Sequence, residues 1–111
     1  MKSFYRPRLT GSLAFAFALV TAAGSAQATG TESCFEPAAA FHQVNPDVLR
    51  AICKVESGLN PRAIGKNDNG SIDVGICQIN SSHFKMLATH GIAPNDLLDA
   101  CKGIYVGAWF L

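Results

Sequence analysis

The sequence predicts a small, mainly α-helical domain with one small, irregular β-hairpin, and three observations predict it. Apolar residues recur at helical spacing in several short segments, most clearly over residues 46–57. A stretch rich in glycine, asparagine and aspartate, residues 60–76, interrupts these segments and contains the tight-turn pair Asn69-Gly70. Four cysteines in 111 residues indicate that disulfides supplement a small core.

The N-terminal segment has the features of a signal peptide. Basic residues precede an apolar run at residues 13–20, and the small-x-small motif Ala26-Gln27-Ala28 follows. The alternative is an uncleaved anchor, but the run is well short of the roughly 20 residues that span a bilayer. We therefore expect cleavage after about Ala28, a domain over residues 29–111 without a stable membrane anchor, and a periplasmic or secreted protein.

Charge argues against nucleic acid as a partner. Removing residues 1–28 takes away three basic residues and no acidic one, which leaves six basic and eight acidic residues and a net charge of −2. The remaining charges are scattered, without a basic stripe or a phosphate-binding glycine loop.

Cysteine usage agrees with export. Cys34, Cys53, Cys77 and Cys101 are an even set, and they permit three pairings among which spacing alone does not choose. A zinc site is the alternative, but no two cysteines have close metal-ligand spacing and the three histidines lie in separate segments. We expect disulfides, with no metal and no cofactor.

Two helices are expected in the first half of the domain. The first covers residues about 34–44 and ends before Asn45-Pro46. Asn45 is a good N-cap and Pro46 suits the first helical position, so a second helix begins there. It is expected to end at Ser57, because Gly58 suits the left-handed C-cap conformation.

The second half is expected to hold a hairpin and three short helical segments. Asn69-Gly70 makes the hairpin turn, and a helix over residues 82–90 follows a cap at Asn80 or Ser81 and ends at Gly91. Pro94 begins another turn or short helix. A final helix over residues 99–111 carries an apolar face made of Ile104, Ala108 and Leu111.

Glu56 is the candidate for acid–base chemistry. At about 100° per residue, Leu49, Ile52, Cys53 and Glu56 fall within one arc of the second helix, so the carboxyl is expected on the apolar face. Burial disfavours the charged form and raises the pKa, which suits a general acid. The alternative is a buried structural glutamate paired with a cation, and the helical wheel alone does not decide between them.

Two motifs outside the wheel favour the catalytic role. Glu56-Ser57 closes a helix, and a later segment reads Gly75-x-x-Gln78-Ile79-Asn80. The pair closely resembles the lytic transglycosylase domain, in particular the small specialised enzymes that accompany secretion, conjugation and pilus machineries. The resemblance covers nearly the whole mature chain. Further matching fragments are Cys34-Phe35, Asn45-Pro46, Asn60-Pro61-x-Ala63-Ile64, Asn69-Gly70-Ser71-Ile72-Asp73 and Ile104-Tyr105-Val106-Gly107-Ala108-Trp109.

The resemblance implies an α+β lysozyme-like fold with short helices around the catalytic helix, and a reaction on peptidoglycan glycan strands. Glu56 would protonate the oxygen of the β-1,4 bond between N-acetylmuramic acid and N-acetylglucosamine, then deprotonate the sugar's 6-hydroxyl to give a 1,6-anhydro product. The substrate's N-acetyl group would replace the second carboxylate of most glycosidases. Asp73 is the one acidic residue in the cleft segment, and a turn role is favoured for it.

The resemblance also implies substrate-binding roles for Ser57, Gly75 and Gln78. Gln78 would orient a sugar through its amide, and the alternative is that the amide only satisfies loop backbone. Ser57 would bond near the glutamate or the sugar, although a serine at a helix end often serves its own backbone. Gly75 would let backbone approach the ligand or would simply make a turn. For Asn80, capping is favoured.

With that fold as the frame, the cysteines can be paired by placement. Cys53 lies one turn before Glu56, and Cys77 directly precedes Gln78, so a bridge between them would tie the catalytic helix to the cleft floor. Cys34 and Cys101 would then join the first and last helices. Each bridge would contribute roughly 3 to 4 kcal/mol in the chain-entropy model.

The chain departs from the family at its C-terminus. The family usually continues into a tyrosine-containing segment that completes the cleft, whereas this sequence stops at Leu111, so we expect a domain truncated at the C-terminus or completed by a partner. Gly103 stands where relatives commonly have asparagine, which weakens the last helix. Two alternatives stay open: a hydrolytic muramidase, and a non-catalytic peptidoglycan-binding or assembly protein. Components of a secretion, conjugation or pilus apparatus are the expected protein partners.

Overall fold

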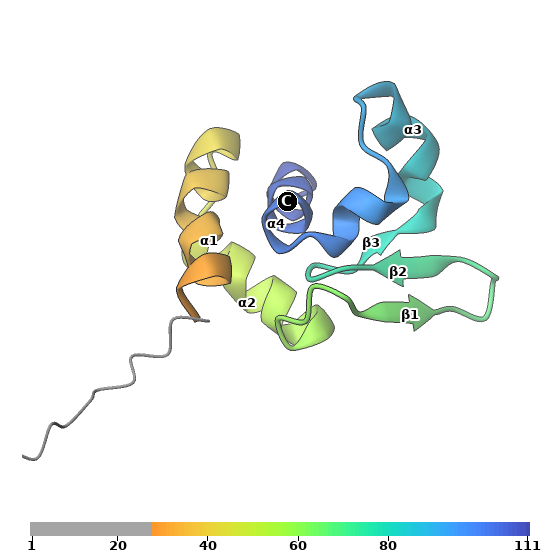
Figure 1. The fold of residues 1–111 in the computed structure, drawn as a ribbon, viewed down its shortest axis with the longest axis horizontal. Coiled ribbons are helices and arrows are strands. Elements are labelled where there is room, and N and C mark those ends of the chain that lie inside the picture. Colours follow the sequence, from red (N-terminus) through yellow and green to blue (C-terminus); the bar gives the residue numbers. More distant parts are fainter. Residues whose placement is uncertain (1–27) are drawn as a thin grey trace, which may run out of the picture.

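The computed structural model describes residues 28–111. In chain order the elements are α1 (Ala28–His42), α2 (Pro46–Ser57), β1 (Ile64–Lys66), β2 (Ile72–Val74), β3 (Ile79–Asn80), the 3₁₀ helix η1 (Ser81–His83), α3 (Phe84–Thr89), the 3₁₀ helix η2 (Pro94–Leu98) and α4 (Ala100–Trp109) (Figure 1). The signal peptide expected over residues 1–28 lies outside the described residues except for Ala28. Over the described part of the chain, every helix is too short or too polar to cross a membrane.

Helix α1 begins about six residues before the predicted start and ends two residues before the predicted end. The early start has a long-range cause that periodicity does not reveal: Glu32 forms an ion pair with Arg50 of α2, with 2.6 Å between Oε1 and Nη2. The end is set by Gln43, whose φ of 56° leaves the helical region. The Val44 N–H then donates to the Ala39 carbonyl at 2.9 Å, which is the bond of a left-handed C-cap.

Helix α2 has the predicted boundaries, and its caps are the predicted residues. The Asn45 side chain accepts hydrogen bonds from the Asp47 and Val48 N–H groups at 2.8 and 3.2 Å. Gly58 has a φ of 64°, and its N–H donates to the Lys54 carbonyl at 2.8 Å. Local chemistry at both ends therefore determines where this helix starts and stops.

The β-hairpin is present, and a third strand that was not predicted pairs with it. Strands β1 and β2 are antiparallel, and the turn between them uses Gly70 at a φ of 83°. Strand β3 pairs with β2 in antiparallel register, with Asp73 opposite Asn80. Asn80 was expected only as a cap. It does cap η1, accepting from the Ser82 N–H at 3.0 Å, but its backbone also completes the sheet.

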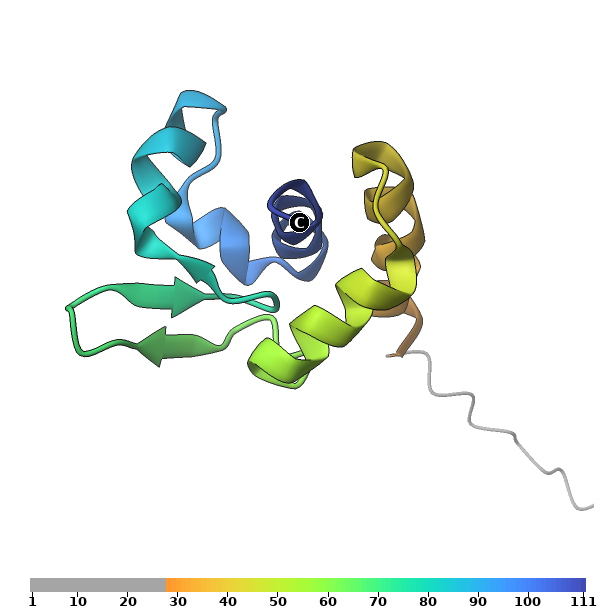
Figure 2. The ribbon, with the colours of Figure 1, turned by 180° about the vertical axis from the view of Figure 1, so that it is seen from behind.

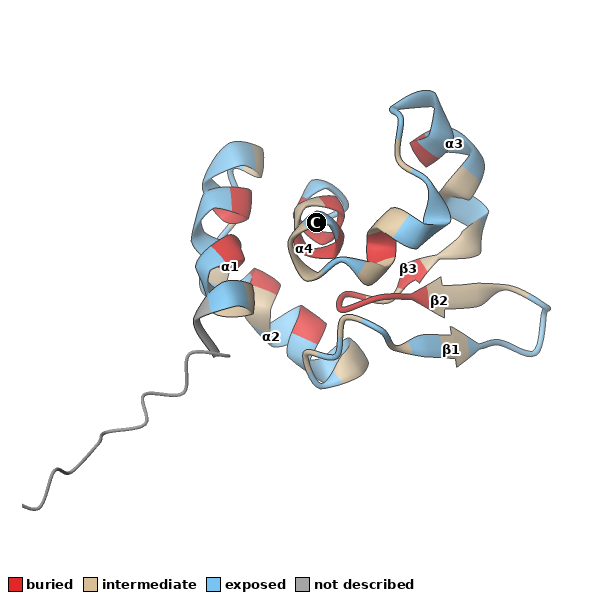
Figure 3. Cartoon of the chain, in the orientation of Figure 1, coloured by how far each residue is buried: buried red, intermediate tan, exposed pale blue. Residues whose placement is uncertain are grey.

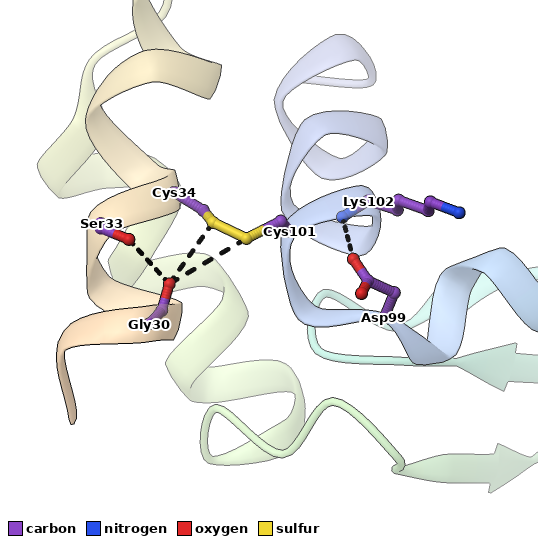
Figure 4. The surroundings of a disulfide bond; sticks show 6 residues. All are labelled: Gly30, Ser33, Cys34, Asp99, Cys101 and Lys102. Atoms are coloured by element: carbon purple, nitrogen blue, oxygen red, sulfur yellow. Dashed lines mark hydrogen bonds between the residues drawn. A yellow bond between two sulfur atoms is a disulfide. The ribbon is translucent and has the colours of Figure 1, made fainter. Parts of the chain in front are cut away.

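The C-terminal helices follow the predicted order with shorter lengths. The helix expected over residues 82–90 starts as η1 and continues as α3, with Gly91 just beyond it at a φ of 74°. Helix α4 is capped by Asp99, which accepts from the Lys102 N–H at 2.9 Å (Figure 4). It ends at Trp109, so the expected inner position of Leu111 is wrong: that residue is 48% exposed.

Helix α4 is the centre of the domain. It lies between α1 on one side and the segment that contains η2 and α3 on the other (Figures 1 and 2). Buried positions on α1, α2 and α4 face one another (Figure 3). The completely buried residues include Leu49, Cys53, Ile76, Leu97 and Ile104. The mainly α, α+β architecture predicted from the sequence is confirmed.

The structure contains the two disulfides expected from placement. Cys34 and Cys101 join α1 to α4 across a Cα–Cα distance of 5.4 Å (Figure 4). Cys53 and Cys77 join α2 to the loop before β3 across 4.2 Å. Among the described residues no cysteine is free.

Candidate active site

The end of α2 holds Glu56, and the structure exposes it. The expected burial of this carboxyl is wrong, because only Leu49 and Cys53 of its helical arc are buried. Ile52 is 36% exposed and the neighbouring Val55 is 85% exposed. A helical wheel identifies the apolar side of a helix, but it does not show whether anything packs against that side. In the last turn of α2, Lys54, Val55 and Glu56 are all exposed, and only Ser57 is partly buried.

The carboxylate of Glu56 also has no partner within the described part of the chain, because no hydrogen bond or salt bridge involves it there. It lies at a shallow hollow of about 310 Å³ whose other lining residues are Val48, Ala51, Ile52 and Val55. The alternative of a structural glutamate held by a cation therefore finds no support in this structure. Within residues 28–111, Glu56 is a carboxylate without a bonded partner, beside an exposed apolar surface.

Ser57 connects the helix end to the loop that follows β2. Its hydroxyl lies 2.5 Å from the carbonyl oxygen of Ile76 and 3.2 Å from that of Cys53. It also accepts a hydrogen bond from the Asn60 N–H at 3.1 Å. A hydroxyl has a single proton to donate, and in Ser57 that proton goes to a backbone carbonyl while the oxygen accepts from a backbone N–H. Ser57 is therefore occupied by backbone contacts both as donor and as acceptor. Its observed role is to hold α2 against the loop.

Gly75 makes the turn that starts this loop, and no other residue fits there. Its φ of 85° is unfavourable for residues that carry a side chain. A Cβ at this position would lie 2.0 Å from the carbonyl oxygen of Leu97. A side chain at Gly75 would thus point into the core. The absence of one lets the backbone of Gly75 lie close to the backbone of η2.

Gln78 ends the loop in a left-handed conformation, with a φ of 54°. Residues other than glycine adopt this region infrequently, and such residues cluster at functional sites. The side-chain Nε2 donates to the carbonyls of Ala63 and Gly75 at 3.1 and 2.9 Å, and these bonds stabilise the conformation. In residues 28–111, Oε1 accepts no hydrogen bond from another group. The amide therefore satisfies loop backbone through nitrogen and has a free acceptor.

Gln78 and Glu56 line adjoining hollows and not a single one. Gln78 lies in a hollow of about 230 Å³ together with Cys77, Ile79, Asn80 and residues of α2 and α4. Ile52 lines both this hollow and the one at Glu56. Hydrogen bonds thus connect Gln78 to Gly75, and Ser57 to Ile76 between them, whereas Glu56 lines a second hollow that shares only Ile52 with the hollow of Gln78.

Asp73 and Asn80 belong to the sheet. Asp73 Oδ1 accepts from Asn80 Nδ2 at 2.8 Å, and its Oδ2 accepts from Asn67 Nδ2 at 3.0 Å. Oδ2 therefore bonds to the hairpin turn, which is the role favoured from the sequence, and Oδ1 joins β2 to β3.

His83 and Phe110 line the Gln78 hollow, and sequence reasoning did not identify them. Their ring centroids are 4.6 Å apart, so they form an aromatic pair between η1 and the end of α4. The two residues are far apart in sequence, and no local pattern predicts the contact. In the described ranges no group of three or more histidine, cysteine or acidic side chains is arranged to hold a metal ion.

The titratable groups with shifted pKa values lie in ion pairs away from these hollows. The hydrogen bond from Arg50 holds the pKa of Glu32 below its ordinary value, and the Glu32 carboxylate raises that of Arg50. The backbone N–H of Ala93, together with Lys102, lowers the pKa of Asp96. These pairs join α1 to α2 and η2 to α4, so they belong to the scaffold.

Known proteins resemble this chain over most of its length. X polypeptide of Escherichia coli (strain K12) is 42% identical over 79 residues, which are 70% of this chain and 47% of that protein. Invasion protein IagB of Salmonella typhimurium is 40% identical over 84 residues, 75% of this chain and 52% of that protein. Protein IpgF of Shigella flexneri is 35% identical over 83 residues, 74% of this chain and 55% of that protein.

The chain spans about half the length of the curated relatives that it matches. The family described as the transglycosylase SLT domain matches residues 32–111, which is more than half of this sequence. That range includes α2, the Gly75–Gln78 loop and α4. The chain is therefore a member of the transglycosylase SLT domain family.

Proposed function

We propose that this chain is a lytic transglycosylase that cleaves the β-1,4 bond between N-acetylmuramic acid and N-acetylglucosamine and leaves a 1,6-anhydro end. The observation that carries the proposal is the free carboxylate of Glu56 at the end of α2, next to a serine that is bonded to the loop of Gln78. Family membership makes peptidoglycan the substrate class.

Glu56 has both proton-transfer roles in this proposal. As an acid it protonates the leaving glycosidic oxygen, and as a carboxylate it then removes the proton of the 6-hydroxyl. The acetamido group of the substrate supplies the function of a second carboxylate. Asp73 is not needed for that function, and both of its oxygens are already bonded to asparagines.

The neighbours of Glu56 support an acid role once a glycan is bound. Val55 and Ile52 present apolar surface to solvent beside the carboxyl. A sugar ring lying on that surface displaces water from it, and proton transfer then occurs in a drier site. Gln78 orients the strand through Oε1, while Ser57 and Gly75 contribute by holding the loop in place.

The proposed setting is the periplasm or cell exterior, where the enzyme opens the wall locally for a secretion, conjugation or pilus apparatus. One relative is named an invasion protein. The cysteine pairs agree with an oxidising compartment.

The test is digestion of purified sacculi by the oxidised chain and by its Glu56→Gln variant. We expect soluble fragments with 1,6-anhydro ends, and a loss of about 100- to 10,000-fold in rate for the variant. Glu36→Gln, which changes an exposed glutamate on α1, is the matched control and should digest normally. Reducing ends in place of anhydro ends would identify a hydrolytic muramidase, and equal rates for wild type and Glu56→Gln would remove Glu56 from the mechanism.

A second candidate function is peptidoglycan binding without turnover, as part of an assembly. The exposure of Glu56 favours it, because a general acid is more effective in a desolvated site. Co-sedimentation of the chain with sacculi, unchanged by Glu56→Gln and without release of fragments, would support this candidate over the first.

A further inference from the structure

We propose that Gly107 is a positioning residue for the candidate active site: the missing side chain lets α4 seat the Cys53–Cys77 disulfide, and the seated disulfide sets where Glu56 and Gln78 lie. This inference rests on the proposed function only for its effect on turnover. The claim that Gly107 positions the disulfide depends only on the contacts of α4.

Gly107 is buried on the face of α4 that meets α2 and the Gly75–Gln78 loop. A Cβ built there would lie 2.8 Å from Cys77 Sγ and 2.9 Å from Cys77 Cβ, closer than side chains approach one another. Gly107 also lines the hollow that contains Gln78. Glycine is unfavourable inside a helix relative to alanine, so its presence here has a packing reason.

Cys77 cannot move aside to admit a methyl group. Its sulfur is bonded to Cys53, and Cys53 is completely buried in α2. The Cα atoms of the two cysteines are only 4.2 Å apart. A displacement of this bridge therefore moves the loop, the helix or both.

The bridge is attached directly to both parts of the site. Gln78 follows Cys77 in the chain, and Glu56 lies three residues after Cys53 on the same helix. Ser57 adds a second connection through its hydroxyl and the Ile76 carbonyl. The contact between Gly107 and the disulfide thus affects the positions of Glu56 and Gln78, although α4 carries neither residue.

Gly103 makes a looser contact on the same face, so it provides an internal comparison. A Cβ there would lie 3.1 Å from Ile76 Cγ2 and 3.2 Å from the Leu97 carbonyl oxygen. The methyl of Ile76 has some freedom to yield, whereas the sulfur of Cys77 has none. Gly103, where the sequence departs from its relatives, thus contacts the loop less closely than Gly107 does.

The experiment compares Gly107→Ala with Gly30→Ala by amide NMR of the oxidised, full-length chain. Gly30 is also a helical glycine, but nothing lies within 4 Å of a Cβ there. We expect Gly107→Ala to shift the amide resonances of Glu56, Ser57 and Gln78 while those of the Asn67–Ser71 turn stay in place. Gly30→Ala should leave all of these unchanged. Unshifted Glu56 and Gln78 resonances in Gly107→Ala would overturn the proposal.

A second pair of variants applies if Gly107→Ala does not fold. Cys53→Ala with Cys77→Gly removes the two atoms that the new methyl group would meet, leaving Leu49 Cδ1 at an ordinary 3.8 Å. Adding Gly107→Ala to that background should then raise the thermal midpoint slightly, because alanine is favoured over glycine inside a helix, and should leave the Gln78 resonance unchanged. A fall in midpoint with the bridge removed would show that the contact is not with Cys77, and the proposal would fail.

Turnover supplies the separate readout for the site. If the wild-type chain digests sacculi, Gly107→Ala should lower the rate by about 10- to 100-fold, since small misplacements of reacting groups cost that much. An unchanged rate beside shifted resonances would contradict the positioning role. If the wild-type chain does not digest sacculi, the proposed function fails, and the resonance shifts still decide the part of this inference that concerns Gly107.

Discussion

The loop that carries Gln78 and the helix end that carries Glu56 are neighbours, yet the rest of the domain packs them very differently. The loop is buried from Gly75 to Cys77, bonded by Ser57 and joined to α2 by a disulfide. The last turn of α2 carries Glu56 and Val55 on its exposed surface. One half of the candidate site is therefore part of the core, and the other half is surface.

This difference in packing suggests that the loop contributes to the stability of the fold, while the end of α2 contributes to the chemistry. Substitutions on the loop side should change the free energy of unfolding, because each contact there also holds the fold together. Substitutions at Glu56 should change reactivity and leave the fold almost as stable as before.

Gly75→Ala should have the largest effect on stability. It places a Cβ 2.0 Å from the Leu97 carbonyl oxygen and imposes a φ of 85° on alanine, so we expect a loss of about 2 to 5 kcal/mol in the free energy of unfolding. Urea denaturation measures it. Gly70→Ala is the control, with a φ of 83° and open space around it, and should cost only about 1 to 2 kcal/mol. Equal losses would mean that packing against η2 is unimportant.

Removing the inner disulfide should come next. Cys53→Ala with Cys77→Ala opens a loop with a sequence separation of 24, which corresponds to about 3 kcal/mol in the chain-entropy model. Thermal unfolding of the oxidised double variant against oxidised wild type gives the difference. A difference close to zero would show that Ser57 and the sheet hold the loop without the bridge.

Ser57→Ala should have an intermediate effect of about 1 to 2 kcal/mol, because the Ile76 carbonyl loses its hydroxyl partner at a partly buried position. Ser33→Ala removes a similar bond, from the Ser33 hydroxyl to the Gly30 carbonyl, at an exposed position and should cost less than about 0.5 kcal/mol. Chemical denaturation of both variants tests this. If Ser57→Ala lowers the free energy of unfolding as little as Ser33→Ala does, Ser57 contributes no more to stability than an exposed serine.

Glu56→Gln should change the free energy of unfolding by less than about 0.5 kcal/mol, since the side chain is exposed and makes no bond within residues 28–111. The same denaturation series measures it. Destabilisation as large as that of Ser57→Ala would mean that Glu56 has a structural partner, and the contrast between the two sides would disappear.

The smallest effect should come from the ion pair between α1 and α2, and it depends on pH. Arg50 lowers the pKa of Glu32 in the folded state, so the stabilisation is complete above the ordinary value of 4.5 and is lost as the pH falls through the folded-state pKa. Glu32→Gln should slightly lower the thermal midpoint at pH 7 and have no effect well below pH 4.5. The two side chains are 41% and 42% exposed, so salt should weaken the difference. A constant difference across pH would contradict an ionic origin.

Sequence patterns predicted the parts of the fold that local chemistry determines. The boundaries of α2 are correct because Asn45 and Gly58 satisfy the helix ends without help from elsewhere. The hairpin is correct for a similar reason, since Asn69-Gly70 suits its turn. The first residues of α1 and strand β3 were missed, because each depends on a partner that is distant in sequence.

The residues proposed for the candidate site came from the sequence and its family resemblance, whereas their geometry did not. Glu56 and Gln78 were identified from the motifs in which they stand. The exposure of Glu56, in contrast, depends on which other elements pack against α2. The double donation by Gln78 Nε2 depends on where the chain places the Ala63 carbonyl. Contacts of this kind involve several elements at once, and no single-segment pattern contains them.

The two disulfides are nested, since Cys53–Cys77 lies wholly within the segment closed by Cys34–Cys101. A protease that cuts the exposed turn around Asp68 therefore leaves two fragments joined by both bridges. A single cut anywhere else between Cys34 and Cys101 also releases nothing. Such a nicked molecule would run as one species on a gel until a reducing agent separates its pieces.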